Sequence, residues 1–204
     1  MSTLRTLLSG VSTALLFGSL ITATPATAQF SESYNFLKAV KDKDAAKAKT
    51  ALDVPGSTIV NSREGDTGDT ALHIVIRRSD VPWLGFLLQG GADPNLRDRS
   101  GNTPLLLATV NNFNEGVRIL LLVNARVDLK NNSGETPLIK AVQARNVTVA
   151  KMLLDAGADP DISDNAAGYS ARDYAKQDTR GGQLAKMLAD APKRKAKPVQ
   201  GPQL

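Results

Sequence analysis

The chain has 204 residues, 42% of them hydrophobic and 22% charged, with a formal net charge of +5. It has no cysteine, which excludes disulfides, thiolate metal sites, cysteine nucleophiles and a lipid-modified N-terminal cysteine. With a single histidine and no Gly-x-Ser-x-Gly motif beyond residue 28, the chain lacks the usual signature of a Ser-His-Asp hydrolase. A hydrolase that uses serine and lysine stays open on composition alone, although no motif indicates one.

Residues 1–28 have the character of a secretory signal peptide. They carry one charge, Arg5, before an apolar stretch at 7–21, and they end in the small-residue sequence Ala-Thr-Ala at 26–28. The apolar stretch has about 15 residues, whereas a membrane-spanning helix needs about 20. We therefore expect cleavage after Ala28 and export to a bacterial periplasm. An uncleaved N-terminal anchor is the alternative.

Residues 29–64 are predicted to form an N-terminal capping unit with a helix pair between Tyr34 and Leu52. Apolar residues such as Phe36 and Val40 recur there among many lysine and aspartate residues. The first unit of a stack of repeats has no neighbour on its outer side, so that side is expected to be polar.

Three segments of the chain then repeat one pattern at a step of 33 residues. The pattern is Gly-x-Thr-Pro-Leu, with Ala in place of Pro in the first copy. Its copies lie at 68–72, 101–105 and 134–138. A second motif, Gly-Ala-Asp or Asn-Ala-Arg, closes an apolar run at the same step. Its copies lie at 91–93, 124–126 and 157–159. Two motifs that hold one register over about 100 residues indicate a repeat architecture.

Each unit is predicted to be a turn followed by two short helices. Thr103 and Thr136 are of a type that caps helices, and the prolines that follow them fit a first helical turn without losing a hydrogen bond. The second helix is expected to end where a residue tolerates positive φ. These end positions are Gly91, Asn124 and Gly157. Apolar residues such as Leu120 and Leu121 recur at helical spacing and are expected to lie in the core.

On these motifs the chain resembles the ankyrin repeat family. The resemblance implies an all-α solenoid of helix-turn-helix units joined by β-hairpin-like loops. We assign three full repeats at 65–97, 98–130 and 131–163, a C-terminal capping repeat at 164–191 and a tail at 192–204. One inserted residue shifts the register of the capping repeat, where Gly168 is the equivalent of Gly134.

The run from Asp159 to Asp164 places carboxylates at alternate positions, so a calcium loop has to be considered. Its sixth position is Asp164, where a calcium loop has glycine, and its twelfth is Ser170, where such a loop has glutamate. We interpret the run as a polar hairpin and expect neither a metal nor another cofactor.

His73, the only histidine, closes a Thr-Ala-Leu-His motif that is similar to the family's Thr-Pro-Leu-His. In the family this ring braces neighbouring turns by hydrogen bonds. The resemblance therefore implies a structural role for His73, and no catalytic residue is assigned.

Ankyrin repeat partners usually bind the concave face, which the loop tips and the first helices form. Matching the chain to the family pattern gives the candidate partner-binding positions. At the loop tips they are Asp66, Thr67, Asp69, Arg99, Ser100, Asn102, Asn132, Ser133 and Glu135, and on the helices they are Arg77, Arg78, Val110, Asn111, Gln143 and Ala144. Arginine is favoured at interfaces, so the Arg77 and Arg78 cluster indicates an acidic patch on the partner. Ordinary solvated surface is the alternative for each position.

The basic charge lies in the tail. The cations there are Lys193, Arg194, Lys195 and Lys197, whereas residues 29–192 are close to neutral. Proline and glycine around these cations, with few apolar residues, predict an extended and disordered segment. The tail is either a solubilising end or a weak, salt-sensitive contact with an anionic membrane or envelope polymer.

Together these features predict an exported protein–protein interaction module, acting as an adaptor, scaffold or inhibitor, without enzymatic activity. We expect an unidentified protein partner, a monomeric chain and no nucleic acid partner. The alternative is an envelope-attached structural protein whose basic tail binds anionic lipid or polymer.

Overall fold

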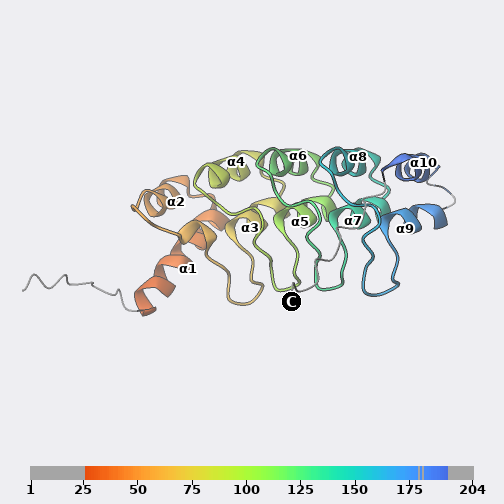
Figure 1. The fold of residues 1–204 in the computed structure, drawn as a ribbon. Helices are drawn as coiled ribbons and strands as arrows, with labels where there is room; N and C mark the ends of the chain where they lie inside the picture. The colour runs from red at the N-terminus through yellow and green to blue at the C-terminus, as the bar shows by residue number, and fades with distance from the viewer. Residues whose placement is uncertain (1–25, 179, 181, 193–204) are drawn as a thin grey trace, which may run out of the picture.

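The computed structural model describes residues 26–178, 180 and 182–192, with side chains from residue 32 onward. Within these residues the chain forms ten α-helices and one short 3-10 helix, and no strand. The helices lie in two rows that run along the molecule, and long loops project from one of the rows (Figure 1). The predicted all-α solenoid is confirmed.

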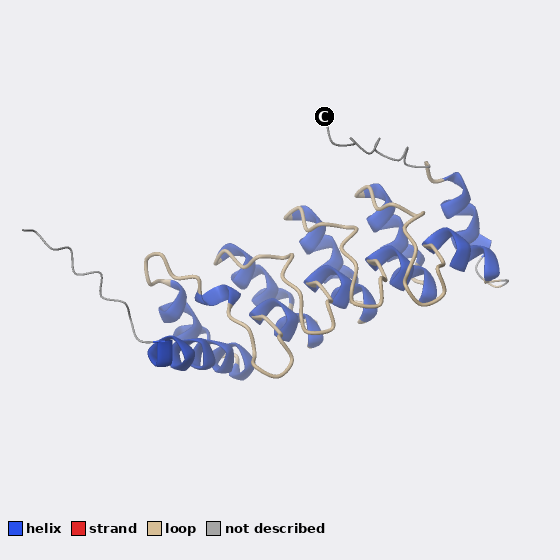
Figure 2. Cartoon of the chain, turned by 60° about the horizontal axis from the view of Figure 1, so that its bottom comes forward, coloured by secondary structure: helices blue, strands red, loops and turns tan. Residues whose placement is uncertain are grey.

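One row, the inner row, carries the projecting loops. It consists of α1 (Ala26–Asp42), α3 (Ala71–Arg77), α5 (Pro104–Val110), α7 (Pro137–Gln143) and α9 (Ala171–Gln177). The outer row consists of α2 (Ala45–Leu52), α4 (Val81–Gln89), α6 (Asn114–Leu122), α8 (Val147–Asp155) and α10 (Gly182–Asp190). The 3-10 helix, Ile59–Asn61, follows α2 in the chain. Inner helices pack against one another along the row from α1 to α9, and outer helices do so from α4 to α10. Figure 2 shows the repeated helix pairs joined by loops.

The inner helices begin at the predicted caps. The Thr103 hydroxyl accepts a hydrogen bond from the Leu106 backbone N–H at 3.3 Å, and the Thr136 hydroxyl accepts one from the Ile139 N–H at 3.2 Å. A proline follows each threonine at the start of the helix. Each cap therefore satisfies an N–H group that the first turn leaves without a partner.

The outer helices end at the predicted positions of positive φ. These are Gly91 at 84°, Asn124 at 58° and Gly157 at 86°. The tight turns between the two helices of a pair also reach positive φ, and the residues there are not glycine. They are Lys43 at 59°, Ser79 at 53°, Asn112 at 54° and Arg145 at 53°. Side chains with a Cβ are strained in this region, so these turns store a small amount of strain.

The core consists of apolar side chains that face between the two rows. Leu120 is fully buried, as predicted. Leu121 is only partly buried against this core, so the expectation that both leucines are core residues is wrong for Leu121. The residue next along α6, Leu122, is 68% exposed. The buried stripe of α6 is therefore narrower than its apolar sequence indicates.

The first helix starts earlier than the sequence analysis expected. α1 begins at Ala26 instead of about Tyr34. No glycine or proline lies between residues 26 and 42, so nothing in the sequence ends the helix before Lys43. The predicted cleavage position after Ala28 lies in the first turn of α1. Among the described helices, none combines the length and the apolar character needed to cross a membrane.

Candidate partner-binding surface

The loops that precede α3, α5, α7 and α9 form a row of fingers, and backbone hydrogen bonds join each finger to the next. Along the row these bonds are Arg99 N–H to Thr67 C=O at 2.9 Å, Asn132 N–H to Ser100 C=O at 3.0 Å and Asn165 N–H to Ser133 C=O at 2.9 Å. The ladder holds the predicted tip positions in one continuous line. A partner would therefore meet a surface that is already ordered.

The three fingers before α5, α7 and α9 are also closed from within by an acceptor side chain. A carboxylate or amide oxygen of Asp98, Asn131 and Asp164 accepts from backbone N–H groups of its own loop. Asp164 additionally accepts from the Tyr174 hydroxyl at 2.5 Å, and this bond lowers the pKa of Asp164. The Asp164 carboxylate, at the end of the run from Asp159 to Asp164, is thus bonded to groups of the chain itself. The described residues contain no group of three His, Asp or Glu side chains placed to hold a metal.

His73 links the first two fingers. Its Nδ1 accepts from the Thr70 N–H at 3.2 Å, so Nε2 carries the proton and donates to the Asn102 carbonyl at 2.9 Å. Burial lowers the pKa of His73, while the Asn102 carbonyl and the charges of Asp69 and Asp98 act in the opposite sense. The ring is a structural brace, as the family resemblance implied.

Arg77 and Asp69 form an ion pair on the first repeat. The Arg77 Nε donates to the Asp69 carboxylate at 2.9 Å, and its Nη2 lies 3.7 Å from the Asp98 carboxylate. The side chain of Arg77 remains 48% exposed, whereas Asp69 as a residue is only 4% exposed. Asp69 therefore anchors Arg77 and does not itself present a free surface, contrary to its predicted place among the contact residues.

Arg78 lies away from a free surface as well. Its Nη1 donates to the Val40 carbonyl of α1 at 2.7 Å, and its Nε donates to the Asp80 carboxylate at 3.1 Å. The guanidinium also lies over the Trp83 ring, 5.4 Å from its centroid. Arg78 joins the first repeat to the N-terminal helix, which a single sequence register cannot reveal. The expected arginine cluster in repeat one is therefore largely neutralised within the molecule.

The remaining predicted positions divide by exposure. Asn102 and Glu135 are partly buried, because Asn102 bonds to Asp98 and Glu135 bonds to Asn131 and Lys140. The exposed positions are Asp66, Thr67, Arg77, Arg99, Ser100, Val110, Asn111, Asn132, Ser133, Gln143 and Ala144. We call these exposed side chains, with Gln177, the inner face. The basic tail positions lie outside the described residues.

Gln177 belongs to this surface and the partly buried Asp178 lies next to it in the chain, and neither residue was predicted from the sequence. The predicted partner-binding positions end in the third full repeat, although the shift of one residue at Gly168 is visible in the sequence. Carrying that shift through the capping repeat makes Gln177 the equivalent of Gln143. The signal needed to find both residues was thus present in the sequence.

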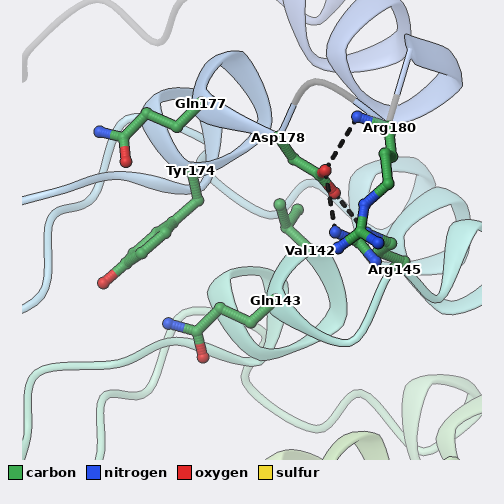
Figure 3. A pocket seen from close by; sticks show the side chains of 7 residues that line it. All are labelled: Val142, Gln143, Arg145, Tyr174, Gln177, Asp178 and Arg180. Atoms are coloured by element: carbon green, nitrogen blue, oxygen red, sulfur yellow. Dashed lines mark hydrogen bonds and ion pairs between the residues drawn. The ribbon is translucent and has the colours of Figure 1, made fainter.

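A hollow of about 430 Å³ lies at this end of the inner face, between α7 and α9 (Figure 3). Its lining residues are Val142, Gln143, Arg145, Tyr174, Gln177, Asp178 and Arg180. The Asp178 carboxylate accepts from the Arg145 Nη2 at 2.9 Å and from the Arg180 backbone N–H at 3.0 Å. The bond from Arg145 lowers the pKa of Asp178, so its carboxylate stays ionised at neutral pH. The ion pair joins the third repeat to the capping repeat.

Comparison with known proteins agrees with this architecture. The family described as "Ankyrin repeats (3 copies)" matches residues 36–131 and 79–164. The chain is 34% identical over 83 residues to oxysterol-binding protein homolog 1 of Saccharomyces cerevisiae, covering 39% of this chain and 7% of that protein. It is 34% identical over 112 residues to the putative palmitoyltransferase ZDHHC13 of Danio rerio, covering 54% and 17%.

A third relative names the repeats in its own description. It is the rice BTB/POZ domain and ankyrin repeat-containing protein NH5.2, 42% identical over 64 residues, with 31% of this chain and 12% of that protein covered. The chain thus spans less than a fifth of the length of each of these relatives. The family match covers the repeats, and ankyrin repeats are non-catalytic modules that generally mediate protein–protein interaction. The chain belongs to the ankyrin repeat family.

Proposed function

We propose that the chain is an exported, non-catalytic interaction protein that binds a protein partner through its inner face in a bacterial periplasm. Family membership supports a binding role, since ankyrin repeats generally mediate contacts between proteins. The signal-like sequence at 1–28 supports export. An adaptor, a scaffold and an inhibitor all fit this surface, because each of them needs only an ordered binding face.

The observation that carries the proposal is a row of exposed side chains at equivalent positions of the inner helices. The row is Arg77, Val110, Gln143 and Gln177. Val110 is 44% exposed although its neighbours on α5 are buried. Apolar and amide side chains on a rigid support fit the mixed composition of protein interfaces. None of these side chains is needed in the core, so they are available for binding.

Site-specific photo-crosslinking in the native cell envelope tests the proposal. A photoreactive residue at Val110 or Gln143 should capture one discrete protein, identified by mass spectrometry. The control is position 118 in the outer row, where the Arg118 side chain is 53% exposed. Equal capture from position 118, or capture from neither face, would contradict binding through the inner face. If the full-length chain sediments with the envelope and a chain that ends at Ala191 does not, attachment through the tail is favoured instead.

Export is tested separately. The protein recovered from the periplasmic fraction should begin at Gln29 on N-terminal sequencing. The control is a variant with Ala28→Leu, which breaks the small-x-small rule and should accumulate with its leader attached. A cytoplasmic protein that begins at Met1 would overturn export while leaving the binding proposal intact.

A further inference from the structure

The two ends of the inner face differ in charge balance. At the first repeat, Arg77 lies between the carboxylates of Asp69 and Asp98. In the hollow between α7 and α9, the lining contains two arginines, Arg145 and Arg180, and one carboxylate, Asp178, which pairs with Arg145. Among the described residues that line the hollow, positive charges therefore outnumber negative ones by one.

Hydrogen-bond donors remain in the hollow as well. Asp178 engages Nε and Nη2 of Arg145, and Nη1 of Arg145 has no bond to this carboxylate. Within the described part of the chain, the exposed Arg180 guanidinium makes neither a hydrogen bond nor an ion pair, and Arg180 meets Asp178 only through its backbone N–H. Two guanidinium groups around a single carboxylate repel each other, and a second anion would relieve that repulsion.

The other walls of the hollow suit a polypeptide. Gln143 and Gln177 are exposed and carry amides that both donate and accept, which matches the unpaired N–H and C=O groups of an extended backbone. The Tyr174 ring is held in place, because its hydroxyl bonds to Asp164 and its ring meets Tyr169 edge-on at 5.6 Å. An ordered aromatic wall of this kind contributes contact area at a small cost in conformational entropy.

We propose that this hollow binds a glutamate or aspartate side chain of the partner protein, presented on an extended segment that runs over Gln143 and Gln177. Arg180 and the free Nη1 of Arg145 bind the partner's carboxylate, and the two glutamines bind its backbone. A guanidinium fits a carboxylate through paired N–H groups, which gives this contact geometric specificity. This inference rests on the proposed function and names the partner chemistry of one part of the inner face. It also moves the expected acidic contact from the first repeat to the capping repeat.

Selection of short random-sequence peptides displayed on phage, with the purified full-length chain as bait, tests the inference. Bound peptides should be enriched in Glu and Asp relative to the unselected library. The charge reversal Arg180→Glu should weaken a selected acidic peptide by about tenfold and shift a new selection toward Lys and Arg. The matched control is Arg126→Glu, an exposed arginine outside the hollow, which should leave the acidic preference unchanged. Circular dichroism should show both variants folded, because neither arginine side chain makes a hydrogen bond or an ion pair with another described residue.

The outcomes separate the inference from the proposed function. If the selected peptides bind Val110→Glu more weakly but bind Arg180→Glu unchanged, the inner face remains the binding surface and the acidic contact is overturned. Peptides without acidic enrichment would overturn it as well. Peptides that bind equally well to all three variants would count against the inner face itself. Binding to phosphatidylglycerol vesicles that depends on Arg180, without peptide binding, would assign the hollow to an anionic surface instead.

Discussion

In the repeats at 98–130 and 131–163, the second residue of the inner helix is a fully buried leucine, Leu105 or Leu138. In the unit that ends the stack, the equivalent residue is Arg172, which is also buried, at 7% exposure. Arg172 donates to the Asp161 carboxylate at 2.8 Å and to carbonyl groups at the end of α10, including that of Leu188. An interior repeat has an apolar neighbour on both sides, whereas the last unit has only one and closes with hydrogen bonds.

The same contrast appears one residue further along each helix. Interior repeats have Leu106 and Ile139 there, both buried. The first repeat has His73 and the closing unit has Asp173, and each of these completes a capping box with the hydroxyl residue before its helix. The first full repeat and the closing unit thus contain titratable groups where the two repeats between them contain apolar ones.

The largest effect is expected in the interior. Leu120→Ala should lower the free energy of unfolding by about 2 to 5 kcal/mol, because Leu120 is fully buried and its removal leaves a cavity. Leu122→Ala on the same helix is the control and should change it by less than about 0.5 kcal/mol, since Leu122 is largely exposed. Urea denaturation measures both. Equal losses would mean that the packing register of α6 is wrong.

Replacing the buried arginine should weaken the end of the stack. Arg172→Met keeps most of the volume but leaves Asp161 and the carbonyl groups at the end of α10 without their donor, so a loss of about 2 kcal/mol is expected. In this variant, the rate of amide hydrogen exchange should increase more in α10 than in α6. The control is Lys176→Met, at a side chain of α9 that is 67% exposed. A stabilised Arg172→Met protein would show that the last unit needs no polar closure.

Acid should weaken the first full repeat and the closing unit in separate pH ranges. Burial lowers the pKa of His73 below 6.5, so the unfolded chain takes up this proton first and stability falls as the pH drops below about 6.5. The bond from Ser170 lowers the pKa of Asp173, so its contribution is complete above about 3.9 and is lost as the pH falls further. Thermal melts across this range should therefore show two steps of decline.

The variants His73→Gln and Asp173→Asn assign those two steps. His73→Gln should remove the step below pH 6.5, even in a less stable protein. Asp173→Asn should only reduce the more acidic step, because the pKa values of Asp164 and Asp178 are lowered as well. An unchanged upper step in His73→Gln would show that another group causes it.

The smallest effect is expected at the turns between paired helices. Ser79→Gly should raise the free energy of unfolding by about 0.5 to 1 kcal/mol, because Ser79 has a φ of 53° that glycine adopts without strain. The opposite change, Gly91→Ala at a φ of 84°, should lower it by about 1 kcal/mol. Thermal denaturation of the two variants measures the difference. A destabilised Ser79→Gly protein would contradict the strain argument.

Much of the fold could be predicted because it depends on local chemistry repeated at a fixed step. The Thr caps before α5 and α7 and the positive φ at Gly91, Asn124 and Gly157 follow from residue type and position. His73 was assigned its bracing role from a motif that resembles the family pattern. The early start of α1 was not predicted, because the apolar spacing becomes regular only near Phe36, whereas the helix begins at Ala26.

The solenoid, its register and most positions of the inner face follow from residue type and spacing, since each depends on one unit and its copy 33 residues away. Which of those positions are free follows from contacts between units. Arg78 is bound by a carbonyl of α1, and Asp69 is buried beneath Arg77. In the hollow, Arg145 and Arg180 lie near a single carboxylate, Asp178, which comes from the capping repeat. Whether a charged side chain is paired depends on atoms from segments that are distant in the sequence. The spacing of the repeats does not show which of these atoms lie together.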